Sequence, residues 1–244
     1  ELVRRKLAPS QTWAAQAVHD GRVLVGGAPA TSPARQVAAD EPIRIETRER
    51  EYVSRGGVKL AGALDAFSVD PAGRRCVDVG ASTGGFTDVL LQRGAAHVVA
   101  IDAGRGQLDW KLRTDERVTV MERTNVRTLG EGAIGDPAAV CVADLSFISL
   151  RTVAPHLVAL TTADAEFVLL VKPQYEAGRA RVGMGGIVRD PQVHAAVVGE
   201  VVAGLETEGI GVVAVVESPI TGADGNVEFF AHARRGPATV ELPA

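Results

Sequence analysis

The stretch Val77-Asp78-Val79-Gly80-Ala81-Ser82-Thr83-Gly84-Gly85-Phe86 decides the fold that we predict for this chain. Its first residues are β-branched around a single aspartate, which is typical of a buried strand. The glycines that follow permit a sharp turn, and the residues from 86 to 93 read as a helix that ends at Gly94. The stretch therefore predicts a strand that enters a glycine-rich turn and then a helix.

Further apolar runs of strand length follow it, at residues 97–102, 118–121, 139–144 and 167–171. Such runs, separated by helical segments, are typical of a parallel sheet that is covered on both faces. Residues 211–216 and 227–233 read as two strands with no helix between them, which predicts an antiparallel end to the sheet. The predicted fold class is α/β, with a mostly parallel seven-stranded sheet and an antiparallel terminal strand.

The first 46 residues predict a separate, smaller α+β module. Ser10 is a suitable N-cap for a helix over 11–19, and residues 22–25 and 42–45 read as short strands. Charges of alternating sign follow, which is typical of a linker. We predict a module at 1–46, a linker at 47–53 and a larger domain at 54–244.

Composition excludes several classes of protein. The chain has 244 residues, of which 46% are hydrophobic, and its net charge is −4, so it is neither disordered nor basic over its whole surface. It has no apolar run of about 18 residues and no basic-then-apolar start. Cys76 and Cys141 are too few for a disulfide scaffold or a cysteine zinc site, and the five histidines lack ligand spacing. We expect a cytoplasmic protein with no metal and no membrane contact.

Asp102 indicates what the glycine turn binds. It ends the next predicted strand, 24 residues after Asp78, where a carboxylate can hold ribose hydroxyls. A dinucleotide fingerprint requires Gly-x-Gly-x-x-Gly, whereas here three residues separate Gly80 from Gly84. An acidic residue before the turn adds nothing for pyrophosphate but supplies a counter-charge for a sulfonium and an amino group. The pattern favours S-adenosylmethionine over NAD, and a ligand-free glycine turn is the alternative.

Four charged residues stand where apolar ones are expected. Asp144 and Lys172 end apolar runs, so their side chains should emerge at the carboxyl edge of the sheet. Glu228 lies in an apolar strand, and Lys59 lies early in the helix before the first strand. For each, a solvated side chain at the end of an element is the alternative. A Lys-Asp-Lys-Glu set suits a ribose hydroxyl that must be oriented and lose its proton while it attacks a methyl group, and Lys172 is the best candidate for that role.

Five ordered motifs resemble the TlyA family, the hemolysin A-type rRNA methyltransferases that carry an FtsJ-like methyltransferase domain. They lie at 54–60, 78–86, 142–150, 171–174 and 225–228. The resemblance implies a Rossmann-like S-adenosylmethionine-dependent methyltransferase fold preceded by an S4 RNA-binding module. It also implies that the substrates are cytidine 2′-hydroxyls of 16S or 23S rRNA, or both, in ribosomal subunits, a modification tied to capreomycin and viomycin sensitivity.

The resemblance assigns residues to three roles. The catalytic tetrad is Lys59, Asp144, Lys172 and Glu228. The cofactor-binding residues are Asp78, Gly80, Ala81, Ser82, Thr83, Gly84, Gly85, Phe86, Asp102 and, near the adenine, Asn125. The expected RNA-binding residues are Arg4, Arg5, Lys6, Arg22 and Arg55. No residue is expected to bind a metal.

The chain departs from the family mainly in its N-terminal part. The basic stretch that usually begins an S4 module is absent, so we expect a truncated module, and six basic against five acidic residues in 1–46 predict weak, salt-sensitive docking. The linker lacks the family's tryptophan, and the basic loop 178–189 either closes over substrate or is a mobile surface loop. The alternatives to a methyltransferase are an NAD-dependent reductase, a membrane-active hemolysin and a non-catalytic S4-type RNA-binding protein.

Overall fold

The computed structural model describes residues 1–8, 10–19, 21–45, 51–222 and 225–240. The chain forms two compact units, Glu1–Arg50 and Glu51–Ala244. Within the described ranges, every helix is too short or too polar to cross a bilayer.

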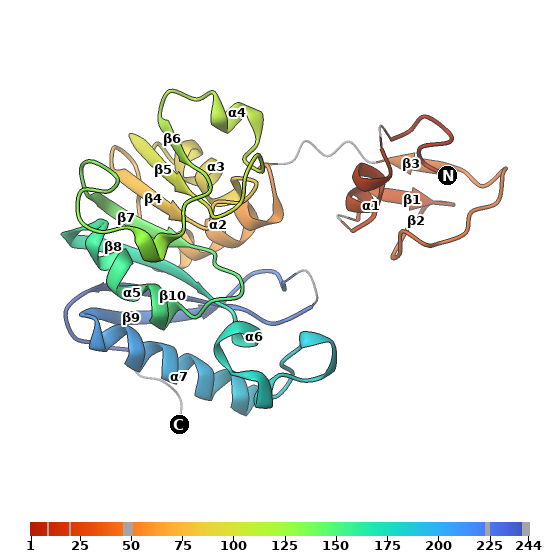
Figure 1. Ribbon diagram of the computed structural model, residues 1–244. Helices are drawn as coiled ribbons and strands as arrows, with labels where there is room; N and C mark the ends of the chain where they lie inside the picture. Colours follow the sequence, from red (N-terminus) through yellow and green to blue (C-terminus); the bar gives the residue numbers. More distant parts are fainter. Residues whose placement is uncertain (9, 20, 46–50, 223–224, 241–244) are drawn as a thin grey trace. The chain divides into compact units, whose positions relative to one another are not determined.

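The first unit consists of one helix and a small antiparallel sheet (Figure 1). Helix α1 (Gln11–His19) packs on the strands β1 (Val23–Val25), β2 (Ala28–Pro29) and β3 (Ile43–Ile45), in the order β2-β1-β3. The predicted helix and two of the strands are confirmed. The two-residue β2 was not predicted, because it is too short to show a hydrophobic pattern.

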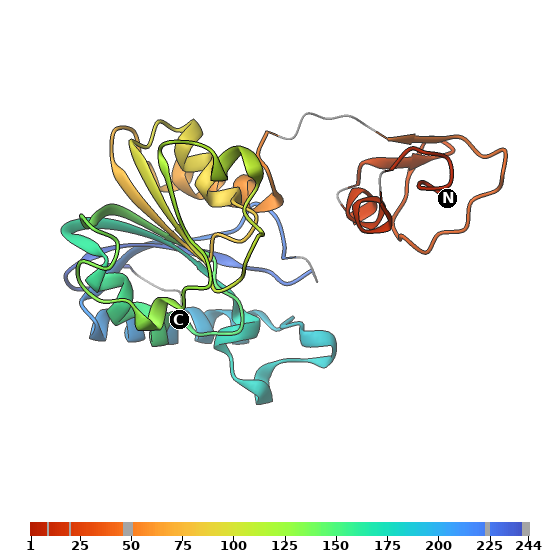
Figure 2. The ribbon, with the colours of Figure 1, turned by 45° about the horizontal axis from the view of Figure 1, so that its top comes forward.

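The second unit contains a seven-stranded sheet in the order β6-β5-β4-β7-β8-β10-β9 (Figures 1 and 2). Adjacent strands from β6 to β8 run parallel, and β10 runs antiparallel between β8 and β9. The predicted fold class is therefore confirmed. The strands are β4 (Arg75–Val79), β5 (His97–Ile101), β6 (Val118–Met121), β7 (Ala138–Ala143), β8 (Thr161–Val171), β9 (Ile210–Glu217) and β10 (Phe229–Arg235).

Helices cover both faces of this sheet, as its uninterrupted apolar strands require. In β4, Val77 and Val79 belong to one core while Cys76 belongs to the other, because successive side chains point to opposite faces. Helices α2 (Arg55–Phe67) and α3 (Gly85–Gln92) pack on one face, and α5 (Leu150–Ala159) and α7 (Pro191–Thr207) pack on the other. Short elements complete the unit: α4 (Trp110–Arg113), α6 (Pro173–Glu176), η1 (Val126–Thr128), η2 (Arg179–Arg181) and η3 (Met184–Gly186).

The predicted linker, 47–53, is only partly described. Residues 47–50 lie outside the described residues, and Glu51 begins the second unit. Tyr52 is buried and packs closely on Gly57. A Cβ added to Gly57 would lie only 2.3 Å from the Tyr52 Cβ. Val53 N donates a hydrogen bond of 2.8 Å to Asp88 in α3. The last residues of the predicted linker therefore pack against the larger unit.

Candidate active site

Four of the predicted site residues follow the ends of parallel strands. Gly80 follows β4, Asp102 follows β5, Asp144 follows β7 and Lys172 follows β8. Because the four strands are parallel and adjacent, these residues lie along the same carboxyl edge of the sheet.

Glu228 and Lys59 reach this edge by different routes. The sequence placed Glu228 inside a strand over 227–233, but β10 begins at Phe229, so that detail was wrong. Because β10 is antiparallel and Phe229 pairs with Val171, its first residue lies beside the last residue of β8. Glu228 therefore meets the parallel strands at their carboxyl ends. Lys59 lies in the second turn of α2.

The four charged residues form two ion pairs. The Lys59 Nζ lies 2.5 Å from the Glu228 Oε2, and these residues are only 8% and 3% exposed. Lys172 pairs with Asp144 in a more open position. Each buried ammonium therefore has a carboxylate beside it, as its removal from water requires.

Two polar residues that the sequence reasoning missed extend these pairs. Lys172 Nζ donates to the hydroxyl of Ser146 at 3.2 Å, and Gln174 Nε2 donates to the second oxygen of Glu228 at 3.4 Å. Since Gln174 lies two residues after Lys172, its bond to Glu228 connects the segment that carries Lys172 to the Lys59–Glu228 pair. Both residues stand inside the motifs at 142–150 and 171–174, which is the signal that could have found them.

The glycine turn packs too closely for any other residue at two positions. Gly80 has φ 88°, and a Cβ there would lie 2.3 Å from the carbonyl oxygen of Asp144. Gly84 has φ 95°, and its Cβ would lie 2.2 Å from a methyl carbon of Leu112. The turn is thus pressed against the Asp144 segment on one side and α4 on the other.

Two cavities flank Gly80. One has a volume of about 170 Å³ and contains members of both ion pairs; the other has about 200 Å³ and is mostly apolar. The first is lined by Ser54, Arg55, Gly56, Lys59, Gly80, Ala81, Ser82, Thr83, Gly85, Phe86 and Asp144. The second is lined by Val79, Gly80, Ile101, Asp102, Ala103, Thr124, Asn125, Val126, Arg127, Leu145, Ser146 and Ile148.

Asp78 lies beneath the turn and lines neither cavity. It is fully buried, and one of its oxygens accepts a hydrogen bond of 2.7 Å from the Thr87 hydroxyl. Its other oxygen is buried with no hydrogen-bond partner among the described residues. Burial raises the pKa of Asp78 to about 7, against the opposing hydrogen bond from Thr87, and the nearby carboxylates of Asp144 and Asp102 raise it further. A cation bound above the turn would offset part of this cost.

Asp102 and Asn125 shape the second cavity. Asp102 accepts hydrogen bonds from the backbone N–H groups of Ser82 at 2.8 Å and Gly104 at 2.6 Å. Its carboxylate therefore joins the glycine turn to the segment after β5. The side chain of Asn125 accepts a bond of 3.1 Å from Arg127 N and begins η1.

The residues present fit S-adenosylmethionine. The apolar second cavity beside Asp102 suits an adenine and its ribose, and Gly80, which lines both cavities, offers its backbone to a ligand on either side. Asp102 has no ion-pair partner among the described residues, and Asp78 is buried below the turn, so both carboxyl groups would be stabilised in their charged forms by a cationic ligand.

The predicted RNA-binding residues of the first unit are used in different ways. Arg5 donates to the carbonyl oxygens of Ala38 and Glu41, both at 2.8 Å, and the Arg22 guanidinium lies over the Trp13 ring, 5.1 Å from its centroid. Both guanidinium groups therefore contact the unit itself.

The remaining three predicted RNA-binding residues lie at the surface. Arg4 is exposed and paired with Glu1, and Lys6 is exposed and its side chain makes no hydrogen bond or ion pair with the described part of the chain. Arg55, in the second unit, lines the first cavity and donates to the carbonyl oxygen of Thr221 at 2.9 Å.

Metal-ligating side chains were expected to form no site. Among the described residues, no three His, Cys, Asp or Glu side chains are arranged to hold an ion. Both cysteines are buried free thiols, and burial raises the pKa of Cys76 to about 12, which keeps it protonated.

A mostly parallel sheet of this order, with a glycine turn after β4 and an acidic residue after β5, is the fold of S-adenosylmethionine-dependent methyltransferases, and the family model below assigns the chain to that class. A solved methyltransferase of this kind from Mesorhizobium loti, at 18% identity, has a TM-score of 0.53 over 71% of this chain and 96% of its own. The FtsJ-like methyltransferase family model matches residues 52–235. The chain belongs to the TlyA family, the hemolysin A-type rRNA methyltransferases.

Three relatives carry this assignment. The 16S/23S rRNA (cytidine-2′-O)-methyltransferase TlyA of Mycobacterium tuberculosis is 54% identical over 94% of this chain and 86% of that protein. Hemolysin A of Brachyspira hyodysenteriae is 38% identical over 91% of this chain and 93% of its own length. A solved hemolysin-type structure from Streptococcus thermophilus has a TM-score of 0.79 at 38% identity, over 95% of this chain and 85% of that one.

Proposed function

We propose that this protein transfers a methyl group from S-adenosylmethionine to the 2′-hydroxyl of a cytidine in 16S or 23S rRNA, or both, acting on ribosomal subunits in the cytoplasm. One observation carries the proposal. Lys59 and Asp144, one from each ion pair, line the same cavity as the glycine turn. A sugar hydroxyl in that cavity lies beside both pairs and beside the cofactor cradle.

Lysine is the informative residue type here. The chain has only four lysines, and two of them form this site, whereas most of its 26 basic residues are arginines. Arginine cannot lose its proton in a protein, whereas a lysine amine can. The choice of lysine therefore supports a proton-handling role rather than simple charge balance.

The residues divide the work as follows. Bound S-adenosylmethionine supplies an electrophilic methyl group on a sulfonium. Asp102 holds the ribose of the cofactor, and Asn125 borders the adenine cavity. Lys172 orients the attacking hydroxyl or accepts its proton, and Asp144 holds the Lys172 amine in place.

Lys59 and Glu228 form the buried wall behind the hydroxyl. With both lysines protonated, the four groups add no net charge beside a sulfonium, and Lys172 would have to release its own proton to solvent before it could accept that of the hydroxyl. The reaction is an in-line displacement, and fixed positions for the oxygen and the methyl group supply much of the acceleration.

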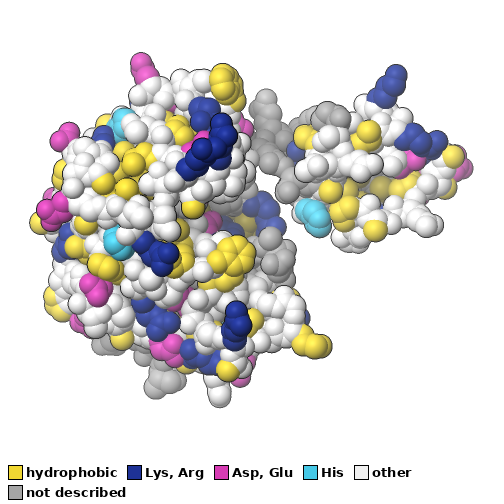
Figure 3. Space-filling model, viewed as in Figure 1, with side chains coloured by type: hydrophobic (Ala, Val, Ile, Leu, Met, Phe, Trp, Pro, Cys, Tyr) yellow, Lys and Arg dark blue, Asp and Glu magenta, His cyan; other side chains and the backbone are white. Residues whose placement is uncertain are grey.

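Basic residues around the mouth of the site suit an RNA substrate. Arg55 lines the first cavity, and Arg127 lines the second. Arg105 and Arg123 are exposed nearby in the chain, and their side chains make no hydrogen bond or ion pair within the described ranges. The view in Figure 3 shows basic side chains in separate groups among acidic and neutral ones, rather than one continuous basic face. A local groove fits this distribution better than a wholly basic surface.

We assign the first unit the role of an S4-type RNA-binding module. Among its predicted RNA-binding cations, Lys6 is exposed and unpaired within the described residues, Arg4 is exposed but paired with Glu1, and Arg5 and Arg22 already contact the unit itself. With so few free cations, the docking of this unit should be weak and sensitive to salt.

Methyl transfer from radiolabelled S-adenosylmethionine to isolated 30S and 50S subunits tests the proposal, with the modified nucleotide mapped by mass spectrometry. Lys172→Ala should abolish transfer while cofactor affinity stays within about threefold. Lys111→Ala is the matched control, because Lys111 is paired with Asp88 outside both cavities. Full turnover by Lys172→Ala would overturn the role of Lys172. Tight NAD binding, or leakage of liposomes by the purified protein, would instead support the alternative functions.

A further inference from the structure

Two segments that leave the sheet side by side carry Lys172 and Asp144. The segment after β7 contains Asp144, Ser146 and Phe147, and the segment after β8 contains Lys172 and Tyr175. Lys172 contacts both Asp144 and Ser146, and the rings of Phe147 and Tyr175 lie 5.0 Å apart. Beyond the strand ends, no β-ladder hydrogen bonds hold these segments together, so their relative position depends on such side-chain contacts.

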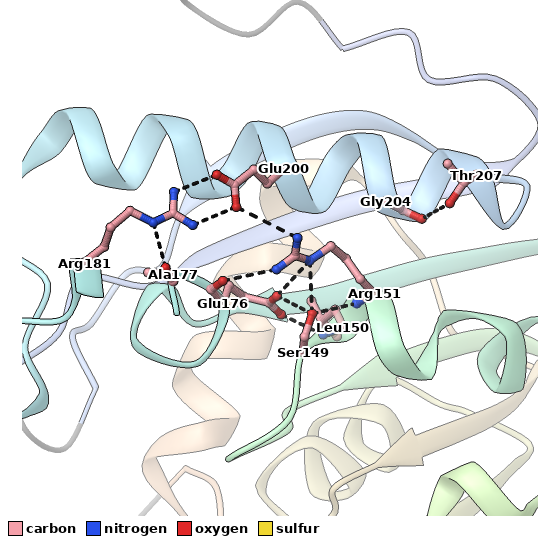
Figure 4. Close-up of polar contacts among 9 residues, drawn as sticks. All are labelled: Ser149, Leu150, Arg151, Glu176, Ala177, Arg181, Glu200, Gly204 and Thr207. Carbon is pink, nitrogen blue, oxygen red and sulfur yellow. Dashed lines mark hydrogen bonds and ion pairs between the residues drawn. The ribbon is translucent and has the colours of Figure 1, made fainter. Parts of the chain in front are cut away.

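Glu176 provides the most buried of these contacts. It is 4% exposed, and it lies one helical turn after Lys172 in α6. One of its oxygens accepts a hydrogen bond of 2.5 Å from the Ser149 hydroxyl, and the other accepts one of 2.7 Å from Leu150 N (Figure 4). Ser149 and Leu150 begin α5, directly after the segment that carries Asp144. The carboxylate thus joins the end of one segment to the end of the other, at the N-terminus of a ten-residue helix where a negative charge is favoured.

An outer set of contacts continues from this carboxylate towards the surface. Arg151 lies 3.6 Å from the Glu176 carboxylate and 3.9 Å from that of Glu200 in α7, and Arg181 lies 2.6 Å from Glu200 (Figure 4). The Glu200 side chain is 40% exposed, against 2% for that of Glu176. Exposed ion pairs contribute little, so the buried carboxylate should dominate the network.

We propose that Glu176 is a positioning residue for the Lys172–Asp144 pair. It touches neither cavity and acts by fixing the Asp144 segment against the Lys172 segment. This inference rests on the proposed function, in which that pair orients the attacking hydroxyl. A displacement of about 1 Å at a reacting centre lowers a rate by up to about 100-fold.

The test compares two variants of the full chain. Glu176→Gln keeps the volume of the side chain but has one acceptor oxygen in place of two. Glu200→Gln is the matched control, since it removes a carboxylate from the same network but leaves the hydrogen bonds of Glu176 to Ser149 and Leu150 in place. Thermal unfolding checks that all variants fold. Ser149→Ala serves as a second variant: it removes the hydroxyl donor to Glu176, together with the N-cap bond from Arg151 N, and leaves the bond from Leu150 N in place.

Two measurements are made on each variant. In methyl transfer to ribosomal subunits, Glu176→Gln should lower kcat at least about 10-fold while the KM for RNA and the cofactor Kd stay within about twofold. Ser149→Ala should lower kcat less, and Glu200→Gln should leave it unchanged. In amide hydrogen exchange, Glu176→Gln should accelerate exchange over residues 145–150 but not over the glycine turn.

Each outcome decides the inference. Unchanged kcat in folded Glu176→Gln, or an equal loss in Glu200→Gln, would overturn it, as would unchanged exchange over residues 145–150. If the wild type methylates neither subunit while exchange is accelerated only in Glu176→Gln, the proposed function fails and the positioning of the segment stands.

Discussion

Replacement of Asp78 by asparagine removes a carboxyl group that lies under the glycine turn. Burial raises the pKa of Asp78 from 3.8 to about 7. Between about pH 4 and pH 7 the native state therefore holds one more proton than the unfolded state. The stability contributed by this group is present at low pH and is lost as the pH rises through 7. One proton corresponds to about 1.4 kcal/mol per pH unit, and the native carboxyl is half deprotonated at pH 7, so the wild type should lose about 2 kcal/mol between pH 5 and pH 7 from this group alone.

Urea unfolding of the cofactor-free chain at pH 5, 6, 7 and 8 measures this loss. The free energy of unfolding of Asp78→Asn minus that of the wild type should grow by about 2 kcal/mol from pH 5 to pH 7 and level off by pH 8. Histidine titrations are common to both proteins and cancel in the difference. Asp70→Asn is the control, because Asp70 is exposed and its side chain accepts only from Ala72 N in the described part of the chain. Parallel pH profiles for wild type and Asp78→Asn would refute the reasoning.

The same variant tests whether the negative charge of Asp78 favours the positive charge of the cofactor. S-adenosylmethionine carries a sulfonium, and S-adenosylhomocysteine carries a neutral sulfur in its place. If the Asp78 carboxylate favours the positive charge through the turn, Asp78→Asn should weaken binding of the first compound more than binding of the second. Equal losses, measured by calorimetry at pH 8, would show that Asp78 shapes the turn without acting as a counter-charge.

Two further substitutions test the packing of the site. Glu228→Gln leaves the Lys59 ammonium, which is only 8% exposed, without its carboxylate. It should therefore lower the free energy of unfolding by about 3 kcal/mol in a urea titration. The double variant Lys59→Met with Glu228→Met should recover most of that loss. Gly80→Ala places a Cβ 2.3 Å from the carbonyl oxygen of Asp144 at a φ of 88°, so it should lower stability by about 2 kcal/mol or more and abolish cofactor binding. Gly106 also has a positive φ, 68°, but open space around it, so Gly106→Ala measures the cost of the backbone conformation without a steric clash. Equal effects of the two glycine variants would contradict the clash of a Gly80 Cβ with the Asp144 carbonyl oxygen.

The parallel sheet and most of its functional edge could be predicted from local sequence. Strand propensity and glycine placement are properties of short stretches, and Gly80, Asp102, Asp144 and Lys172 each follow an apolar run directly. Once the strands are parallel, their ends must meet at one edge. The TlyA family was recognised from motifs at that edge, and its relatives confirm it.

Local sequence could not predict where β10 begins or which groups Arg5 and Arg22 contact. Glu228 was placed inside a strand because its neighbours are apolar, but the ladder with β8 begins one residue later. Arg5 and Arg22 look like free cations in sequence, and only folding brings Ala38, Glu41 and Trp13 to them. A hydrophobic pattern reports burial and period, and it carries no information on distant partners.

The sequence by itself therefore determined the order of strands and helices, the glycine turn and the family, since each of these depends on short stretches of contiguous residues. Tertiary structure alone decided which lysine pairs with which carboxylate, that Asp78 lies buried under the turn, and that Glu176 joins the segments of Asp144 and Lys172. Lys59 and Glu228 are 169 positions apart. Such contacts depend on how sheet order and side-chain packing bring separate segments together, and no local pattern of residues specifies them.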